Sequence, residues 1–236
     1  MKKFSRLVAL TAAAILAFSA TPAVLAQAWP TKTVRIVVSF PPGTPGDVIT
    51  RLIQPALQSA WGQTVVVDNK PGAGGNLAAS EVAQAKDDHT LLVGPDTVLT
   101  INPHLYKKLS FDPRTALQPV TYFASFNQTL VCNPAAGIAS LEAFSRLPAS
   151  RPYASGGAGS PSHMAMELLL STLGTRLTHV PYKGPGPAAQ DVMAGHVDCS
   201  FVVSSVVLPH VQSGRLRAIG GQAGIRPVLA HKPRSN

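Results

Sequence analysis

Charged residues, aromatic residues and long apolar runs are all scarce in this 236-residue chain. Asp, Glu, Lys and Arg make up 13% of it and aromatic residues 6%, whereas 45% is hydrophobic, enough for one large or two small cored domains. The basic residues are scattered, with no block of five and no interleaving with aromatics, so we expect no nucleic-acid partner. Beyond the N-terminus no apolar run reaches membrane-spanning length, since the best, SFVVSSVVLPHV, is interrupted at Pro209.

Cysteine is nearly absent as well. Cys132 and Cys199 lie in apolar, strand-like runs. In an exported protein they can form a disulfide, but two cysteines in a large cored domain are more often buried as small hydrophobic residues. The sequence does not give the Cα separation that a bridge needs. Both alternatives therefore stay open, with the unbridged form favoured.

The motifs of common enzyme classes are missing. There is no G-x-S-x-G, H-E-x-x-H, C-x-x-C or G-x-x-x-x-G-K-[ST] motif, and PGAGGN is no dinucleotide fingerprint because Leu77 stands where its third glycine belongs. We therefore expect no enzyme, no cofactor and no metal site. A serine hydrolase using Ser160 and His163 is the rival, although two residues three apart at a helix start do not by themselves form a nucleophile–base relay.

The N-terminus carries the pattern of an export signal. MKKFSR is basic, residues 7–20 are apolar and small, and small-residue cleavage sites follow after Ala26 and after Ala28. This order is typical of a secretory signal peptide, with an uncleaved N-terminal anchor as the less favoured alternative. We expect residues 1–28 to be a signal peptide and the remainder to be exported. Removing residues 1–26 lowers the formal net charge from +9 to +6, a mildly basic balance that suits a small anionic ligand.

A strand–turn–helix pattern recurs from Trp29 onward. Apolar β-branched runs end in Gly-rich turns, which lead into segments with apolar residues at helical spacing. Gly62 stands just past the first such segment, where a C-terminal glycine belongs. This alternation is typical of α/β proteins with parallel sheets. The expected strands are 33–40, 64–70, 90–94, 151–155, 177–182, 197–203 and 215–223, and the main helices are 47–61, 76–86, 163–174 and 188–196.

The pattern is interrupted over 110–134, where two strand-like pieces follow each other with no helix between them. We interpret this interruption as the connection between two α/β lobes. Lobe 1 is expected over 29–116 together with a return segment at 215–236. The crossover or hinge is expected over 117–131, and lobe 2 over 132–214.

The turn after the first expected strand, FPPGTPGD, has features of a ligand-binding loop. Gly43 and Gly46 let the backbone approach a ligand without a Cβ, and Asp47 is placed to cap the following helix. The free N–H groups of a helix start attract an anion. For any single loop an ordinary βα connection is the simpler explanation. The same arrangement recurs in SGGAGSPSHM and KGPGPAAQ, and this repetition favours binding.

Several long motifs carry a family resemblance. FPPGTPGDVITR, VVVDNKPGAGGN, TLLVG, INPHLYKKLSFDP, YASGGAGSPSHMAMELL and THVPYKGPGPAAQDVMAGHVD resemble, in this order, the Bug (TctC-like, UPF0065-type) receptors of tripartite tricarboxylate transporters. The resemblance implies an α/β, two-lobed type II periplasmic binding-protein fold with doubly wound sheets. It also implies a monomeric solute-binding protein in the periplasm, which captures a small carboxylate for the membrane permease subunits of the transporter.

The resemblance also implies a binding site. In that family the loop after the first strand and the Ser/Gly loop of the second lobe hold the ligand carboxylate, largely through backbone N–H groups and ordered water. Carried over, the ligand-binding residues are Pro42, Gly43, Thr44, Gly46, Asp47, Thr97, Ser155, Gly156, Gly157, Ser160 and His163. For His163 a capping or surface role is the favoured alternative. Val202 and Val203, where relatives often have polar residues, favour a monocarboxylate with an apolar or aromatic body over a citrate-like polyanion.

The end of the chain departs from the family. Relatives are longer and finish the first lobe with further helices, whereas here GIRPVLAHKPRSN is basic and broken by Pro227 and Pro233. We expect a C-terminally truncated receptor whose first lobe is incomplete and less well ordered than the second. A degenerate product without transport function is the alternative.

Overall fold

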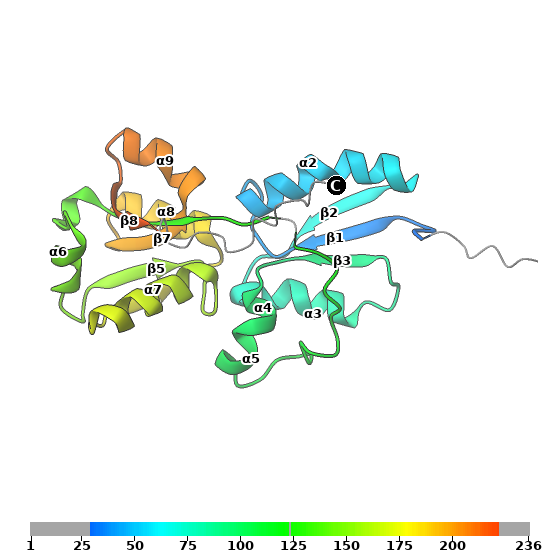
Figure 1. Ribbon diagram of the computed structural model, residues 1–236, viewed down its shortest axis with the longest axis horizontal. Helices are drawn as coiled ribbons and strands as arrows, with labels where there is room; N and C mark the ends of the chain where they lie inside the picture. Colours follow the sequence, from blue (N-terminus) through cyan, green and yellow to red (C-terminus); the bar gives the residue numbers. More distant parts are fainter. Residues whose placement is uncertain (1–28, 123, 222–236) are drawn as a thin grey trace, which may run out of the picture. The chain divides into compact units, whose positions relative to one another are not determined.

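The computed structural model describes residues 29–122 and 124–221. The expected signal peptide, 1–28, and the second part of the return segment, 222–236, lie outside the described residues. The described helices and strands form two β-sheets with their covering helices (Figure 1), and both sheets belong to one compact unit that begins at Lys32. Within the two described ranges no helix has both the length and the apolar character needed to cross a membrane.

The first sheet is parallel, with the strand order β2-β1-β3. The chain moves from β1 to β2 in one direction and from β2 to β3 in the other. Right-handed crossovers therefore place α2 and α3 on opposite faces of the sheet (Figure 1). The bounds are β1 (Val34–Val38), α2 (Pro45–Trp61), β2 (Val65–Asn69), α3 (Asn76–Gln84) and β3 (Thr90–Val93).

Side-chain alternation builds the core of this sheet. Val34, Ile36 and Val38 of β1 are buried in one cluster, which Leu57 and Trp61 of α2 cover. Successive residues of a strand point to opposite faces, so every second β1 residue meets α2. The expected strands and helices of this region are present, and the predicted Gly62 ends α2 with φ of 63°.

The second sheet is mixed, with the strand order β6-β5-β7-β4-β8. β5 is parallel to β6 and β7, whereas β4 runs antiparallel to both β7 and β8. Its elements are β4 (Gln128–Cys132), α6 (Leu141–Ser145), β5 (Pro152–Ser155), α7 (Pro161–Leu173), β6 (Thr178–Pro181), α8 (Pro185–Ala194), β7 (Cys199–Val203), α9 (Ser204–Gln212) and β8 (Arg217–Gly221).

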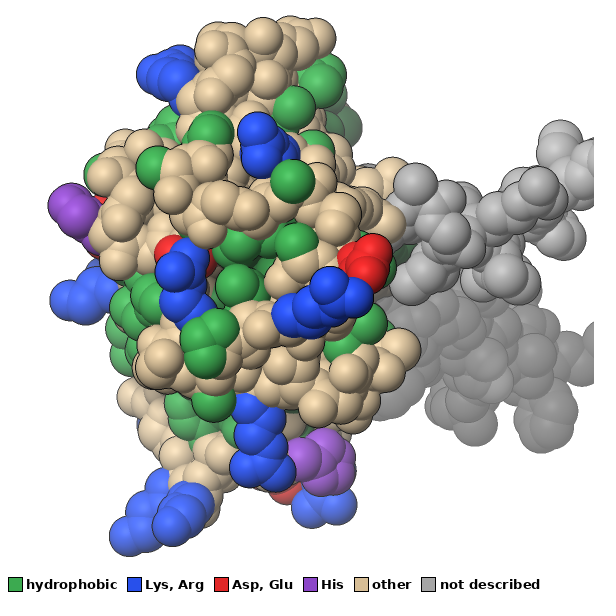
Figure 2. All heavy atoms as spheres, turned by 90° about the vertical axis from the view of Figure 1, so that its left-hand side faces the viewer, with side chains coloured by type: hydrophobic (Ala, Val, Ile, Leu, Met, Phe, Trp, Pro, Cys, Tyr) green, Lys and Arg blue, Asp and Glu red, His purple; other side chains and the backbone are tan. Residues whose placement is uncertain are grey.

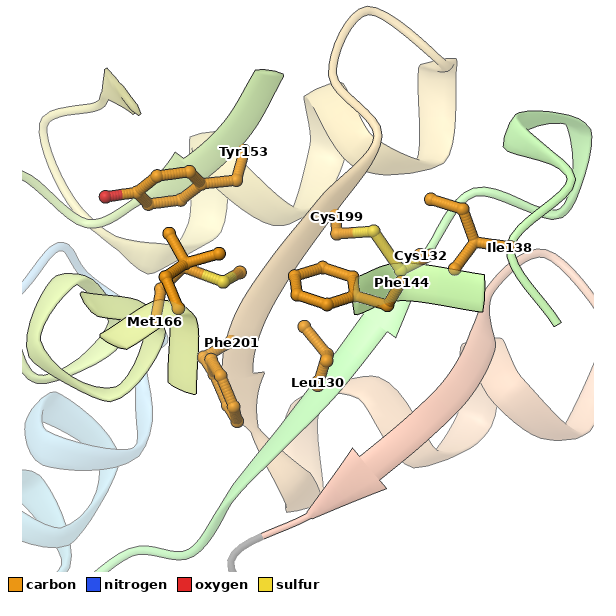
Figure 3. Close-up of a cluster of buried hydrophobic side chains, with 9 residues drawn as sticks. Leu130, Cys132, Ile138, Phe144, Tyr153, Met166, Cys199 and Phe201 are labelled. Carbon is orange, nitrogen blue, oxygen red and sulfur yellow. A yellow bond between two sulfur atoms is a disulfide. The ribbon is translucent and has the colours of Figure 1, made fainter. Parts of the chain in front are cut away.

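The second sheet has a core on each face. One contains the large side chains of Figure 3: Leu130, Ile138, Phe144, Tyr153, Met166, Phe201 and the two cysteines. The other contains Val131, Ala154, Val202 and the small residues of α8. Neighbours in sequence, such as Leu130 and Val131, fall into different cores because strand side chains alternate between faces. α7 therefore covers the large-residue face and α8 the small-residue face.

The two cysteines form a disulfide, so the favoured unbridged form is wrong. Cys132 and Cys199 are directly opposite each other on the antiparallel strands β4 and β7, with a Cα–Cα distance of 4.0 Å. Their neighbours Asn133 and Asp198 share a ladder hydrogen bond of 2.8 Å. The cysteines therefore occupy the adjacent non-hydrogen-bonded pair, where opposing side chains come closest.

Three features differ from the expected organisation. β8 was expected to lead back toward lobe 1, but it pairs with β4 in the second sheet, where it extends the sheet beside its antiparallel neighbour. The loop after β3 contains two single-turn helices, α4 (Thr97–Thr100) and α5 (Asn102–Leu105). Of the two strand-like pieces in the interruption, the second forms β4, and the described residues of 118–124 form no strand. The lobe boundaries themselves stay a prediction.

Basic side chains are dispersed on the face of the molecule seen in Figure 2. Lys and Arg are separated there by apolar and uncharged polar surface rather than gathered into one patch. A polyanion such as nucleic acid needs several phosphates neutralised side by side. This face offers no such continuous surface.

Candidate functional site

The loops at the carboxyl ends of the parallel strands line a pocket. In α/β sheets this edge is where ligands bind. From the first sheet the lining residues are Ser39, Phe40, Gly72, Gly74, Gly75 and Pro95. From the second they are Gln128, Gly156, Ser160, Pro161, Ser162, Gly184, Pro185, Phe201, Val202 and Val203.

The pocket is small and uncharged. None of the described residues that line it is acidic, basic or a histidine. Its polar side chains are Ser39, Gln128, Ser160 and Ser162. The cavity measures about 70 Å³. The pocket therefore suits a small organic molecule with an apolar body.

Glycine is required where loops of the two sheets touch. A Cβ on Gly74, whose φ is +62°, would lie 2.3 Å from the carbonyl oxygen of Ala158. A Cβ on Gly184 would lie 2.5 Å from Cγ of Pro41. No side chain fits at these distances. The PGAGGN and KGPGP turns thus let the backbone of one sheet's loops pack directly against loops of the other.

A hydrogen bond fastens the same contact. The Tyr106 hydroxyl, just after α5, donates to the carbonyl oxygen of Ala158 at 2.7 Å. Beside it, Nδ2 of Asn102 donates to the carbonyl oxygen of Gly74 at 3.1 Å and to Oδ1 of Asn76 at 2.8 Å. Side chains of the α4–α5 segment therefore hold the PGAGGN turn and the Ser/Gly loop against each other.

The Ser/Gly loop of the second sheet is held by the start of α7. The Gly156 N–H donates to Oγ of Ser162 at 2.9 Å, and the Gly159 N–H donates to Nδ1 of His163 at 3.1 Å. Ser160 is the N-cap, and its Oγ accepts from the His163 N–H at 3.3 Å. These loop N–H groups thus donate within the protein. The hydroxyls of Ser160 and Ser162, 3.1 Å apart, are the polar side chains that this loop presents to the pocket.

A stack of rings supports the loop from behind. The His179 ring lies between Tyr153, at a centroid distance of 4.9 Å, and His163, at 4.1 Å. Burial lowers the pKa of His179 to about 4, with His163 contributing in the same direction. Nε2 of the neutral His179 lies 2.6 Å from Oγ of Ser155, which accepts in turn from the Gly157 N–H at 3.1 Å. The neutral imidazole thereby fixes the first half of the loop.

The FPPGTPGD turn is closed by its own carboxylate. The helix cap is Thr44 rather than the expected Asp47, because α2 begins two residues earlier, at Pro45. Asp47 instead accepts from the Gly43 N–H at 2.9 Å and from Asn69 Nδ2 at 2.8 Å. Burial raises the pKa of Asp47, but these bonds and an ion pair with the adjacent helix turn outweigh it and leave the pKa below its ordinary value. The carboxylate therefore orders the turn internally.

The expected site residues divide into two groups. Gly156 and Ser160 line the pocket. The others lie outside its lining: Pro42, Gly43, Thr44, Gly46, Asp47, Thr97, Ser155, Gly157 and His163. Ligand binding by any of them stays a prediction. Several of the others still build the site, because Asp47, Ser155 and His163 hold the loops that carry lining residues.

Sequence reasoning missed several lining residues, among them Ser39, Phe40 and Gln128. Ser39 and Phe40 follow β1 directly, and Gln128 begins β4. The rule that ligands bind beyond the strand ends could have indicated Ser39 and Phe40. The position of Gln128 depends on the pairing of β4 with β7, which no short sequence pattern reveals. The two valines expected to form an apolar wall, Val202 and Val203, do line the pocket.

The geometry does not assemble a serine nucleophile with a histidine base. Ser160 Oγ bonds to Ser162 Oγ and to the His163 backbone N–H, while the His163 ring accepts from Gly159 and stacks on His179. Among the described residues no hydrogen bond joins the Ser160 hydroxyl to that ring. The same ranges contain no cluster of three or more His, Cys, Asp or Glu that could hold a metal ion.

Comparison with known proteins identifies the family. The sequence profile described as "Tripartite tricarboxylate transporter family receptor" matches residues 49–228. Protein BugT of Bordetella pertussis is 34% identical over 202 residues, which cover 83% of this chain and 62% of BugT. The chain thus spans less than two thirds of the length of that relative.

Solved structures agree with this match. Rpa4515 of R. palustris, whose structure was solved with adipate, is 31% identical with a TM-score of 0.76, and the match covers 86% of this chain and 70% of that one. MatC of Rhodopseudomonas palustris, solved with bound malate, is 32% identical with a TM-score of 0.76, covering 84% and 69%. These similarities show the two-lobed periplasmic binding-protein fold.

Proposed function

Since this chain belongs to the tripartite tricarboxylate transporter receptor family, we propose that it is a periplasmic solute-binding receptor. It captures a small carboxylate and presents it to the membrane permease of such a transporter. An N-terminal signal peptide directs its export. The observation that carries the proposal is the uncharged pocket at the strand ends, with the Ser160 and Ser162 hydroxyls at the start of α7.

The start of α7 is suited to an anion. α7 has 13 residues, and its aligned peptide dipoles place partial positive charge at its first turn, beside the Ser160 and Ser162 hydroxyls. A hydrogen bond to a charged group contributes about 1.5–3 kcal/mol. Two such bonds, one for each hydroxyl, supply about 3–6 kcal/mol, which corresponds to dissociation constants from millimolar to tens of micromolar. A carboxylate can therefore be held without an arginine or lysine in the pocket.

The lobes of the receptor close around the ligand. We place lobe 1 over 29–116 and assign the whole second sheet, including β4 and β8, to lobe 2, with the hinge in the segment ahead of β4. Two contacts support a closed form in which loops of the first and second sheets meet: the Tyr106–Ala158 hydrogen bond, and the close packing of the Gly74 backbone against the Ala158 carbonyl oxygen. Hinge closure of this kind is how binding proteins enclose their ligands.

Calorimetry and thermal-shift measurements with a panel of small mono-, di- and tricarboxylates test the proposal. Val203→Trp should fill the pocket and abolish binding, because Val203 lines it. Leu208→Trp is the matched control, since Leu208 is 55% exposed on α9 and does not line the pocket. If a folded sample responds to no acid, the proposal is refuted. Ester hydrolysis that is lost in Ser160→Ala would instead support the hydrolase.

A further inference from the structure

Ser39 carries a buried hydroxyl group that forms no hydrogen bond with the described residues. Its side chain is 6% exposed, and its Oγ has no hydrogen-bond partner. A buried hydroxyl without a partner is costly, so native proteins rarely leave one. Ser39 is also one of the residues that line the pocket. A ligand group in the pocket would supply the missing partner.

Two glycine positions of the first sheet's loops pack closely against Ser39, which also lines the pocket. On the side of β3, a Cβ on Gly94 would lie 3.1 Å from Ser39 Oγ, so the strand end is packed close against it. Cβ of Ser39 also lies 3.6 Å from the position of a Cβ on Gly75. Phe40 and Pro95, next to it in the lining, offer no polar side-chain atom. Among the described lining residues from the loops of the first sheet, Ser39 alone contributes a polar side chain, and the others are Phe40, Pro95 and glycines.

Ser39 and the serines of α7 come from different sheets. Ser39 follows β1 of the first sheet, whereas Ser160 and Ser162 belong to the start of α7, which covers the second. The pocket thus has a polar group on each side, and Phe201 and Val202 belong to the apolar wall that completes it. Only the α7 side combines two hydroxyls with a helix start. The Ser39 side has one neutral hydroxyl and no cation.

From these observations we propose that Ser39 is a specificity-determining residue for an uncharged polar group of the ligand. The preferred ligands are monocarboxylates whose body carries a hydroxyl or keto group opposite the carboxylate. A serine hydroxyl both donates and accepts, so it can pair with either group. A second carboxylate at Ser39 would lose its hydration for one hydrogen bond and no opposite charge. This inference rests on the proposed function and specifies its ligand class.

A three-way ligand series tests the inference by calorimetry. The acids are carbon chains of three to six carbons and a series of benzoates. In each set, the end of the molecule far from the carboxylate carries a methyl group or hydrogen, a hydroxyl, or a second carboxylate. At the length that fits best, the hydroxy acid should bind about three- to tenfold more tightly than the other two. In Ser39→Ala the advantage over the plain acid should disappear, and the ratio should fall to about one. Ser213→Ala, which changes an exposed serine beyond α9, should keep the advantage.

The outcomes separate the two proposals. If no acid of any series binds, the receptor function itself fails and the inference falls with it. If acids bind but the dicarboxylate is preferred, or the hydroxy acid has no advantage, only the role of Ser39 is refuted. The role is refuted as well if Ser39→Ala leaves the preference unchanged. Thermal unfolding of Ser39→Ala without ligand checks its fold, and because the removed hydroxyl has no partner, its midpoint should not fall.

Discussion

Removal of the disulfide should destabilise the protein by an amount that follows from the length of chain that the disulfide closes. The bridge joins Cys132 and Cys199, which are 67 residues apart in sequence. The loop-entropy relation for a loop of that length gives about 4 kcal/mol at 25 °C. With a urea dependence of about 2 kcal/mol per molar, the midpoint of unfolding should fall by about 2 M.

Urea titration followed by far-UV circular dichroism measures this shift. The oxidised protein is compared with the same chain reduced while unfolded and refolded in reductant. A Cys132→Ala/Cys199→Ala variant is the second comparison, which separates the lost cross-link from the lost packing of two buried sulfurs. A difference below about 0.5 M between the oxidised and the reduced chain would refute the loop-entropy reasoning. Two free thiols in protein isolated from an oxidising compartment would refute the bridge itself.

Three further predictions concern the loops around the pocket. Burial holds the pKa of His179 at about 4, below its value of about 6.5 in the unfolded chain. The stability that the neutral ring contributes is therefore complete above about pH 6.5 and is lost toward pH 4, by at most about 3 kcal/mol because the ring is only half-buried. In His179→Asn the urea midpoint should change less with pH across this range, and an unchanged pH dependence would contradict the assignment. Tyr106→Phe removes a 2.7 Å hydrogen bond between the loops and should weaken ligand affinity about three- to tenfold in calorimetry. Tyr122→Phe, at a residue that is 77% exposed, should leave the affinity unchanged. Equal affinities of Tyr106→Phe and the unchanged protein would argue against closure through this bond. Gly74→Ala places a Cβ 2.3 Å from a backbone oxygen, whereas Gly43, whose φ of +77° is also positive, has nothing within 4 Å of such a Cβ. In urea unfolding, Gly74→Ala should cost at least about 2 kcal/mol and Gly43→Ala about 1 kcal/mol. Equal costs would mean that the loop contact does not contribute to stability.

Most of the fold could be predicted because its elements repeat a strong local pattern. β1 reads VRIVV, a buried β-branched run, and α2 ends at a glycine that adopts the left-handed conformation. Local sequence is enough to recognise such elements. The helices α4 and α5 were missed because each has only four residues, too few to show a helical period.

Long-range pairing could not be predicted from the same information. The strand β8 was recognised, but its neighbour β4 precedes it by about 85 residues, and no local feature specifies that pairing. The disulfide was misjudged for the same reason, because the antiparallel register of β4 and β7 is what brings Cys132 opposite Cys199. Contacts of this kind depend on the complete sheet order.

The candidate site was predicted in kind but not in detail. The Gly-rich turns were correctly expected at the carboxyl ends of strands, and Gly156 and Ser160 of the Ser/Gly loop line the pocket. In the FPPGTPGD turn, Asp47 accepts a hydrogen bond from Gly43 and orders the turn, and ligand binding by this turn stays a prediction. Ser39 carries no motif at all, and only the structure shows that its hydroxyl is buried without a partner.

The cross-link and one wall of the pocket share a single pair of strands. Cys132 pairs with Cys199 at one end of the β4–β7 ribbon, and Gln128 pairs with Val203 at the other. At about 3.4 Å per residue, the two pairs are about 14 Å apart. The disulfide at one end keeps the register of β4 and β7 while residues at the other end are exchanged. The ribbon therefore offers a place to randomise positions 128 and 203 together when a small-molecule biosensor is evolved from this chain.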